Sequence, residues 1–322
     1  PVPSDNPLQD LELANRPQGT AVETDGGYAG GNDSNFRSFE DADGNKIQSR
    51  SASTSQNQPS TRVAPAPQST HRAIEIGKTF VVLPAYNEEA GLPELLSEIE
   101  KLFAINGREY EVIVVDDAST DDKSKVASQS SFHMPVTLVQ HKKNQNLPGA
   151  LRTGFLTALK LSEDHDVIVT MDGDNTHPPS MINPLLQKIS EGYDVMIGSR
   201  FQPGSRVVGV PWTRVVTAFG ARMLFKIMMP IPAVRDYTCG YRAYRANVLR
   251  DSVDFYGDQF VSEAGFSCMA DVLLKMRRFK YVFGEVPMLL RYDQKEGDSK
   301  MAVGKTIIQT LSLLLRRRFG GY

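Results

Sequence analysis

Short runs of large apolar residues recur through the middle of the chain, and each run ends in polar side chains. The runs at 79–83, 111–115, 136–140, 167–171 and 193–198 are rich in Val and Ile, which is typical of strands buried in a parallel sheet. The segments between them place Leu, Ile and Phe at helical spacing. Strand and helix therefore alternate, which predicts an α/β fold with a mainly parallel central sheet and right-handed crossovers.

Residues 1–72 show neither of these patterns. They are rich in Gly, Ser, Asn, Gln, Asp and Pro and contain few large apolar residues. Such a segment buries too little apolar surface to offset the conformational entropy that ordering costs. We therefore expect a disordered N-terminal tail over 1–72, a catalytic domain over 73–290, and a C-terminal segment over 291–322 with an acceptor loop and an amphipathic helix.

The composition narrows the class of protein. The chain has 322 residues with 40% hydrophobic residues and a formal net charge of −2, so a large core is expected and a nucleic-acid partner is not. Its two cysteines give neither a disulfide framework nor a zinc spacing, which favours a reducing, cytoplasmic location. We expect no membrane span and no secretory signal, because no apolar run is long enough and no basic region precedes one.

Polar side chains follow three of the predicted strands at the point where each strand ends: Asn87 and Glu88, then Asp116 and Asp117, then Asp172 and Asp174. The carboxyl ends of parallel strands meet at one edge of a sheet, where ligands of open α/β folds bind. Two carboxylates on a tight turn suit Mg²⁺ or Mn²⁺ bridging a diphosphate, and the next predicted strand ends in the basic Arg200. The pattern favours a nucleotide-diphosphate site. A dinucleotide site is not expected, since no Gly-x-Gly-x-x-Gly follows the first strand.

These segments, in this order, carry a resemblance to a known family. The motifs are Val-Val-Leu-Pro-Ala-Tyr-Asn-Glu-Glu (81–89), Val-Val-Asp-Asp-Ala-Ser-Thr-Asp (114–121), Asn-Leu-Pro-Gly-Ala-Leu-Arg-Thr-Gly (146–154), Met-Asp-Gly-Asp-Asn-Thr-His-Pro-Pro (171–179) and Ile-Gly-Ser-Arg-Phe (197–201). The chain resembles glycosyltransferase family 2 over about residues 78–302. It is most similar to the branch of polyprenyl-phosphate (dolichyl-phosphate) mannosyltransferases and glucosyltransferases. Later segments at 236–245, 284–287 and 297–300 resemble the same branch.

The resemblance implies a GT-A fold, which is Rossmann-like, and an inverting transfer from a nucleotide sugar such as GDP-mannose or a UDP-hexose. It implies that base and ribose contact Pro84, Ala85, Tyr86 and Glu88, with Asp117 on the base edge. It also implies that Asp172 and Asp174 hold the metal and the diphosphate, that Arg200 and Arg214 bind phosphates, and that Lys300 closes over the diphosphate on a mobile loop. Thr176 departs from the branch, which carries a side chain there that can assist the metal.

Whether the reaction needs a general base depends on the acceptor, and the hypotheses for this chain differ in the acceptor. A polyprenyl phosphate is already an anion, so arginines that hold it suffice. A soluble hydroxyl acceptor, such as a saccharide or natural product, requires a general base, for which Asp236 is the candidate. A third hypothesis, from another class, is a catalytically silent nucleotide-sugar-binding or scaffold protein.

Two further residues have alternative interpretations. His177 is either a metal ligand or a source of a hydrogen bond that orders its loop, and Trp212 is either a packing residue or an anchor at a membrane interface. The sequence alone leaves both choices open.

The C-terminal segment predicts an amphipathic helix over 305–318 that ends in three arginines. Its apolar face contains Ile307, Ile308, Leu311, Leu314 and Leu315. About 14 residues give roughly 21 Å, which is too short to cross a hydrocarbon core. The face either packs on the catalytic domain, packs on a second copy in a homo-oligomer, or contacts the cytoplasmic face of an anionic membrane.

Overall fold

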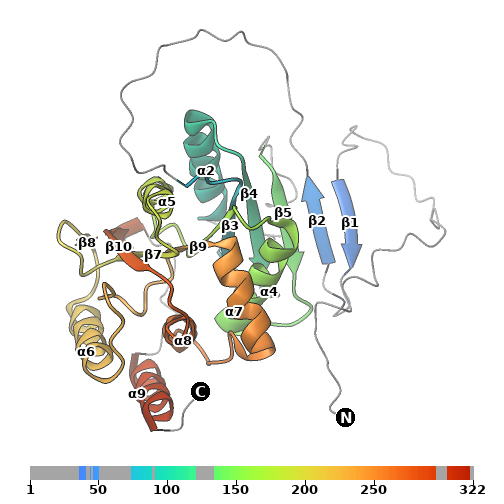
Figure 1. Ribbon diagram of the computed structural model, residues 1–322. Coiled ribbons are helices and arrows are strands. Elements are labelled where there is room, and N and C mark those ends of the chain that lie inside the picture. The colour runs from blue at the N-terminus through green and yellow to red at the C-terminus, as the bar shows by residue number, and fades with distance from the viewer. Residues whose placement is uncertain are drawn as a thin grey trace, which may run out of the picture.

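The computed structural model describes residues 36–40, 44, 46–50, 74–88, 91–120, 134–294 and 303–319. Within these ranges a nine-stranded sheet forms the centre of the molecule, with the strand order β1-β2-β5-β4-β3-β6-β9-β7-β10 (Figure 1). A small two-stranded sheet joins β8 and β11 in parallel. The strands are β1 (Phe36–Glu40), β2 (Lys46–Arg50), β3 (Thr79–Ala85), β4 (Tyr110–Asp116), β5 (Val136–Gln140), β6 (Val167–Thr170), β7 (Val195–Ser199), β8 (Arg206–Val208), β9 (Arg242–Arg245), β10 (Phe283–Pro287) and β11 (Leu289–Arg291).

The predicted parallel core is confirmed. β3 is hydrogen-bonded in parallel to β4 on one side and to β6 on the other, and β4 is parallel to β5. β3 and β6 are buried along nearly their whole length, which is why both sequences are continuous apolar runs rather than alternating ones. β7 and β10 also pair in parallel, but β9 lies between β6 and β7 and is antiparallel to both.

Seven described α-helices flank these strands. They are α2 (Leu92–Asn106), α4 (Asn146–Leu161), α5 (Ile182–Ser190), α6 (Trp212–Met228), α7 (Ala246–Tyr256), α8 (Ser267–Met276) and α9 (Val303–Phe319). Short 3₁₀ turns occur at Pro179–Met181, Gly257–Gln259 and Tyr292–Gln294. Figure 1 shows α6, α8 and α9 together near the β7–β10 end of the sheet, away from β1 and β2.

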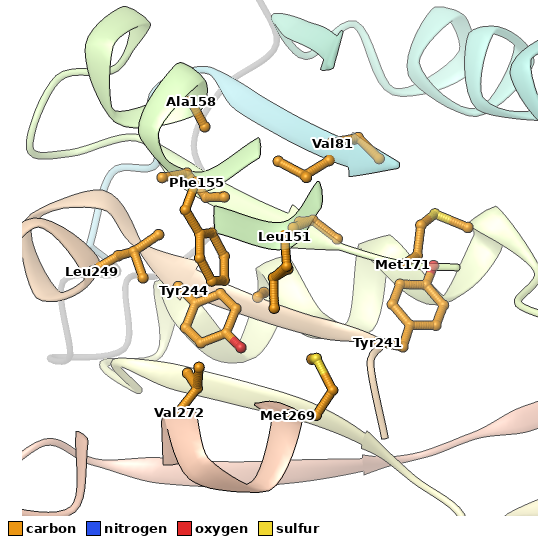
Figure 2. Packing of buried hydrophobic residues seen from close by; sticks show 14 of the residues in the cluster. Val81, Leu151, Phe155, Ala158, Met171, Tyr241, Tyr244, Leu249, Met269 and Val272 are labelled. Atoms are coloured by element: carbon orange, nitrogen blue, oxygen red, sulfur yellow. The ribbon is translucent and has the colours of Figure 1, made fainter. Parts of the chain in front are cut away.

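The core on the α4 side is built from aromatic and aliphatic side chains of four elements. Figure 2 shows Phe155 of α4 pointing toward Tyr244 of β9, with Leu249 of α7 and Val272 of α8 around them. The Phe155 and Tyr244 rings meet edge to face, with their centroids 5.5 Å apart at 86°. This packing fixes β9, and through it the turn that precedes β9, against the rest of the sheet.

Within 1–72, which the sequence predicts to be a disordered tail, the structure describes two strands. Residues 36–40 and 46–50 form a hairpin whose second strand extends the sheet by pairing antiparallel with β5. Gly44, between the two strands, has φ +73°, a conformation that glycine adopts without strain. The rest of 1–72 lies outside the described residues.

The predicted C-terminal helix is confirmed as α9, but its buried face differs from the predicted one. Leu313 and Leu314 are fully buried, whereas Leu311 and Leu315 are exposed. The side chains of 303–308 lie outside the description. Arg317 anchors α9 by donating two hydrogen bonds from its guanidinium to the buried Asp271 of α8, at 2.8 and 3.1 Å. The helix therefore packs partly on the catalytic domain. In the ranges that the structure describes, no helix has both the length and the apolar character needed to cross a bilayer.

Candidate functional site

The carboxyl ends of β3, β4 and β6 lie together, as the sequence predicts for parallel neighbours. The Asp117 amide donates to the Ala85 carbonyl at 2.9 Å, and the Asn87 amide donates to the Ser119 hydroxyl at 3.1 Å. The Met171 amide reaches back to β3 at the Val82 carbonyl. The three polar clusters therefore form one continuous edge.

Each of these strand ends carries a residue in the left-handed backbone region. Asn87, Ala118 and Asn175 have φ of 50°, 58° and 59°. A left-handed non-glycine residue is uncommon, and alanine has no polar side chain to compensate. Such conformations persist where surrounding bonds hold them, and they gather at ligand sites. Here the Thr120 amide donates to the Asn87 carboxamide oxygen at 3.1 Å, which ties two of the three turns together.

The Asp117 carboxylate is fixed from one side. Its Oδ1 lies 2.7 Å from Nδ1 of His141 and accepts the Gln145 amide at 2.7 Å. The other imidazole nitrogen, Nε2, lies 2.9 Å from the Thr153 hydroxyl. Both partners are buried, with side-chain exposure of 0% for His141 and 4% for Asp117. One oxygen of the carboxylate is therefore occupied, and its orientation is set before any ligand arrives.

The acidic pair Asp172 and Asp174 lies on a tight loop against β3. A methyl group at Gly173 would lie 3.0 Å from the Pro84 carbonyl oxygen, so glycine permits this close approach without a shift of the backbone. The Asp174 Oδ1 accepts the Thr176 hydroxyl at 2.7 Å and its amide at 3.3 Å. The Asp172 side chain is 41% exposed, so solvent or a ligand can reach its carboxylate.

His177 orders this loop. Its Nδ1 accepts the Asp172 amide at 3.2 Å, so in the neutral imidazole the proton is on Nε2, which lies 3.8 Å from the Asp172 Oδ2. The ring stacks on Tyr241 with centroids 5.1 Å apart, and Tyr241 donates its hydroxyl to the Pro178 carbonyl. This geometry matches the loop-ordering interpretation rather than that of a metal ligand.

Asp172 also faces the turn that leads into β9. A methyl group at Gly240 would lie 3.0 Å from the Asp172 Oδ1, and the Thr170 hydroxyl donates to the Gly240 carbonyl at 2.7 Å. The same turn carries Asp236 and Thr238, which hold Arg200 at the end of β7. The acidic loop and Arg200 are therefore neighbours across this turn.

Arg200 and Asp236 form a two-pronged ion pair. The guanidinium donates Nε to Oδ2 and Nη2 to Oδ1, both at 2.7 Å, and Nη2 also donates to the Thr238 hydroxyl. Burial alone would lower the pKa of Arg200, but the Asp236 carboxylate raises it, and the charge of Asp172 acts in the same direction. Arg200 is thus a permanent cation beside the acidic loop.

Asp236 has little capacity left to accept a proton. Besides Arg200, it accepts the backbone amides of Arg200, Thr238 and Cys239 at 3.0 to 3.3 Å, and its side chain has no exposed surface. Burial would raise the pKa of Asp236, but Arg200 outweighs burial and holds it below its usual value. This environment suits a residue that positions Arg200, not a general base.

Glu285 of β10 holds the same turn from outside. Its Oε1 accepts the amides of Arg235 and Asp236 at 2.6 and 2.7 Å. Burial raises the pKa of Glu285, although the two amides lower it in part. The segment 284–287 belongs to the family resemblance, which assigns no role to Glu285.

The other predicted site residues lie along the edge formed by the ends of β3, β4 and β6, lie in α6, or fall outside the residues that the structure describes. Pro84 and Ala85 end β3, and Tyr86 and Glu88 follow them. Arg214 in the first turn of α6 donates to the Tyr292 hydroxyl at 2.9 Å. Lys300 falls in 295–302, outside the described residues.

Among the described residues, no group of three or more His, Cys, Asp or Glu side chains is placed to hold a metal by itself. Two carboxylates on one loop still suit Mg²⁺, which is commonly bound by one or two carboxylates together with substrate phosphates. The donor set therefore fits a metal that arrives with a diphosphate, rather than a closed protein cage.

Reasoning from the sequence missed His141, Thr238 and Glu285. His141 directly follows the strand 136–140, so the rule that picked out Asp117 and Asp172 would have found it. Thr238 and Glu285 carry no such signal, because their contacts depend on how β9 and β10 pair.

Comparison with known proteins adds independent information. A protein-family model described as "Glycosyl transferase family 2" matches residues 80–253. The chain is 35% identical to "Dolichol-phosphate mannosyltransferase" of Pyrococcus furiosus over 240 residues, which cover 74% of this chain and 63% of that protein. It is 30% identical to "Undecaprenyl-phosphate mannosyltransferase" of Micrococcus luteus, covering 76% and 97%. A crystal structure of a mycobacterial protein has the same fold with a TM-score of 0.53 at 18% identity, covering 76% of this chain and 75% of that one.

Proposed function

Because this chain belongs to glycosyl transferase family 2, we propose that it moves a hexose from a nucleotide-diphosphate sugar to a polyprenyl phosphate, with inversion and with a divalent metal. The two mannosyltransferase relatives carry lipid phosphates in their names, and the chain spans less than two thirds of the first one. The observation that carries the proposal is the acidic loop of Asp172 and Asp174 beside an arginine that Asp236 holds in place.

The donor lies along the edge formed by β3, β4 and β6. Base and ribose contact Pro84, Ala85, Tyr86 and Glu88, and the oxygen of Asp117 that His141 does not hold faces the base edge. A carboxylate can accept from the N–H groups of guanine or uracil, which agrees with GDP-mannose or a UDP-hexose as donor. The fixed orientation of Asp117 supports this role, since its other oxygen is already occupied by two donors.

Asp172 and Asp174 would hold Mg²⁺ or Mn²⁺ together with the diphosphate. A metal bound there supplies a Lewis acid that neutralises the charge developing on the leaving diphosphate. His177 sets the direction of Asp172, and Thr176 sets that of Asp174, so both carboxylates are oriented by their own loop. Lys300 adds a further positive charge to the diphosphate.

The acceptor phosphate is held by Arg200, with Arg214 as a second arginine. Its oxygen attacks the anomeric carbon as the bond from that carbon to the diphosphate oxygen breaks, and the sugar inverts. No proton has to be removed, because the phosphate is already ionised. A hydroxyl acceptor would need a general base. Both oxygens of Asp236 already accept hydrogen bonds from Arg200, and its pKa is lowered, so these observations favour the phosphate acceptor.

This function places the protein at the cytoplasmic face of a membrane, where a polyprenyl phosphate presents its head group. α9 is one candidate for the contact, because Leu311, Leu315 and Phe319 are exposed along it at a spacing of four residues. The terminal arginines of α9 suit an anionic surface.

The test is a transfer assay with matched acceptors. Purified protein is given labelled GDP-mannose or UDP-glucose with a short-chain polyprenyl phosphate, the corresponding polyprenol, or a soluble saccharide. We expect transfer to the phosphate alone, and only with Mg²⁺ or Mn²⁺ present. Equal transfer to the polyprenol or the saccharide would favour a hydroxyl acceptor. Binding of the donor without any transfer would favour a silent nucleotide-sugar-binding protein.

A further inference from the structure

The α6 helix turns large apolar side chains outward. Six of them are exposed, from 41% for Met223 to 75% for Trp212 and Ile227. They recur at intervals of three and four residues, so they lie on one side of the helix: Trp212, Val215, Val216, Phe219, Met223 and Ile227. We refer to these six residues as the α6 face.

This arrangement is the reverse of an ordinary surface helix. Such a helix buries its apolar stripe and presents polar residues to water. On α6 only Phe225 is buried, where it stacks on Tyr237. Val207 and Val208 of β8 are exposed as well. A contiguous apolar surface of this kind marks a place where something other than water binds.

The charged residues of the segment that contains the α6 face all have one sign. Between residues 200 and 235 the sequence contains no Asp and no Glu, while the whole chain has a net charge of −2. The basic residues of the segment are Arg200, Arg206, Arg214, Arg222, Lys226 and Arg235. The partner of this surface is therefore apolar and anionic.

A basic cavity adjoins the C-terminal end of α6. It has a volume of about 310 Å³ and is lined by Met229, Leu274, Arg277, Arg278, Arg317 and Arg318. Met229 directly follows α6, and the arginines come from the ends of α8 and α9. Among these residues four are cationic and none is acidic.

Part of this positive charge has a structural explanation. The C-terminal ends of α8 and α9 supply roughly one unit of negative charge together, and Asp271 pairs with Arg317 and Lys275. The lining of the cavity still includes four arginine side chains and no carboxylate. It is suited to the phosphate of a lipid head group, with the apolar side chains of Met229 and Leu274 beside it.

We propose that the α6 face, the exposed row of α9 and the arginine cavity form a docking surface for an anionic lipid bilayer. The apolar side chains enter the interface, and the cavity takes a lipid phosphate. A second copy of the chain is a poorer occupant, because two such faces would bring like charges together. The proposal rests on the lipid-phosphate function and names the surface that brings the protein to its acceptor.

Trp212 provides a direct readout, because it is the chain's one tryptophan. Wild-type protein is titrated with vesicles of phosphatidylcholine, or of phosphatidylcholine with phosphatidylglycerol, both free of polyprenyl phosphate. We expect a blue shift of the Trp212 emission and co-sedimentation with the anionic vesicles only. Since these vesicles contain no acceptor, the result is independent of whether the transfer reaction is as proposed.

Vesicle binding by substituted proteins tests whether the proposed surface is the one that contacts the bilayer. Phe219→Glu with Ile227→Glu should weaken vesicle binding about tenfold or more, while Ile105→Glu, at a more exposed position on α2, should leave it unchanged. Arg277→Gln with Arg318→Gln should weaken it about fivefold for each arginine. Lys101→Gln with Arg108→Gln is the matched control for charge. All four variants should keep wild-type turnover on a water-soluble short-chain polyprenyl phosphate.

Three outcomes would overturn the proposal. The first is wild-type protein that ignores anionic vesicles. The second is binding that the Phe219 and Ile227 variant retains. The third is a dimer without lipid that the same variant converts to a monomer in sedimentation velocity, which would make the α6 face a contact between copies. Displacement of the vesicles by inorganic phosphate beyond the effect of equal ionic strength would show a site for the ion alone.

Discussion

The carboxylate of Asp117 and the imidazole of His141 lie 2.7 Å apart, and both side chains are buried. A second donor, the Gln145 amide, reaches the same oxygen. The pair therefore leaves one carboxylate oxygen with a fixed direction. This preorganisation costs nothing at the moment of binding, since the fold has already immobilised the group.

His141→Phe tests this relationship. The change removes the contact to Asp117 and keeps a ring of similar size in a buried position. We expect KM for the nucleotide sugar to rise about tenfold, the scale of losing one or two hydrogen bonds to a charged group. kcat should change little, because Asp117 is remote from the bond that breaks. Steady-state kinetics at varied donor concentration separate the two constants.

The matched control is His165→Phe, an exposed histidine at the start of β6, which should be silent. A fall in kcat with an unchanged KM in the His141 variant would contradict a role in donor binding. Thermal unfolding of both variants shows whether the core has been disturbed.

Asp172→Asn and Asp174→Asn should each lower kcat about a hundredfold or more while leaving the fold intact, because each removes a charge from a site built for a divalent cation. Asp164→Asn, an exposed carboxylate, is the control. Activity is measured with Mg²⁺, with Mn²⁺ and in excess chelator, and circular dichroism reports the fold. Full turnover in either variant, or in chelator, is incompatible with the metal assignment.

Asp236→Asn should destabilise the protein by about 3–5 kcal/mol, because it leaves Arg200, whose side chain is only 24% exposed, without its counter-charge. The folded-state pKa of Asp236 is lowered, so the pair stabilises the fold above the unfolded value of about 3.9 and is lost as pH falls through the folded value. The variant should accordingly lose stability at pH 7 and show a weaker acid dependence below pH ~4. Urea titrations at several pH values measure both effects.

The same variant distinguishes positioning from base catalysis. If Asp236 positions Arg200, the pH profile of kcat keeps its shape and only its height falls. Arg200→Met with Asp236→Leu should recover stability but not activity. Recovery of activity in that double variant would show that neither residue takes part in transfer.

A chain that begins at Arg72 should keep the turnover of the full chain, since the described site residues all follow that position. It should be somewhat less stable, because removing β1 and β2 exposes the edge of β5 to water. Activity and thermal unfolding of the two chains are compared directly. A large loss of turnover would place the N-terminal segment in the site.

The apolar runs were sufficient to predict the parallel part of this GT-A-like fold. β3, β4, β5, β6 and β7 all fall on those runs because strands buried on both faces must be apolar throughout. β9 could not be found in this way. Its four residues include Arg242, whose buried guanidinium donates to the carbonyls of Tyr237 and Met269, and no periodicity reveals such a partner.

The same limit applies to the helices. Periodicity shows that a helix has an apolar face, but it does not show what that face meets. On α9 the pair of Arg317 with Asp271 selects Leu313 and Leu314 for burial and leaves Leu311 and Leu315 outside. At the site, the acidic loop could be predicted because it directly follows a strand. The ion pair of Asp236 with Arg200 could not, because it joins residues that are 36 positions apart in the sequence.

The antiparallel strand β9 has one more consequence. β7 ends at Ser199 and β9 begins at Arg242, and the two strands are paired, with Ile197 opposite Arg242. The intervening residues therefore leave the sheet and return to the place where they left it. Their length and sequence can change without shifting the register of any strand in the nine-stranded sheet. A lineage could thus remodel α6 and its surroundings for a new acceptor or a new membrane while the half of the sheet that binds the donor stayed as it was.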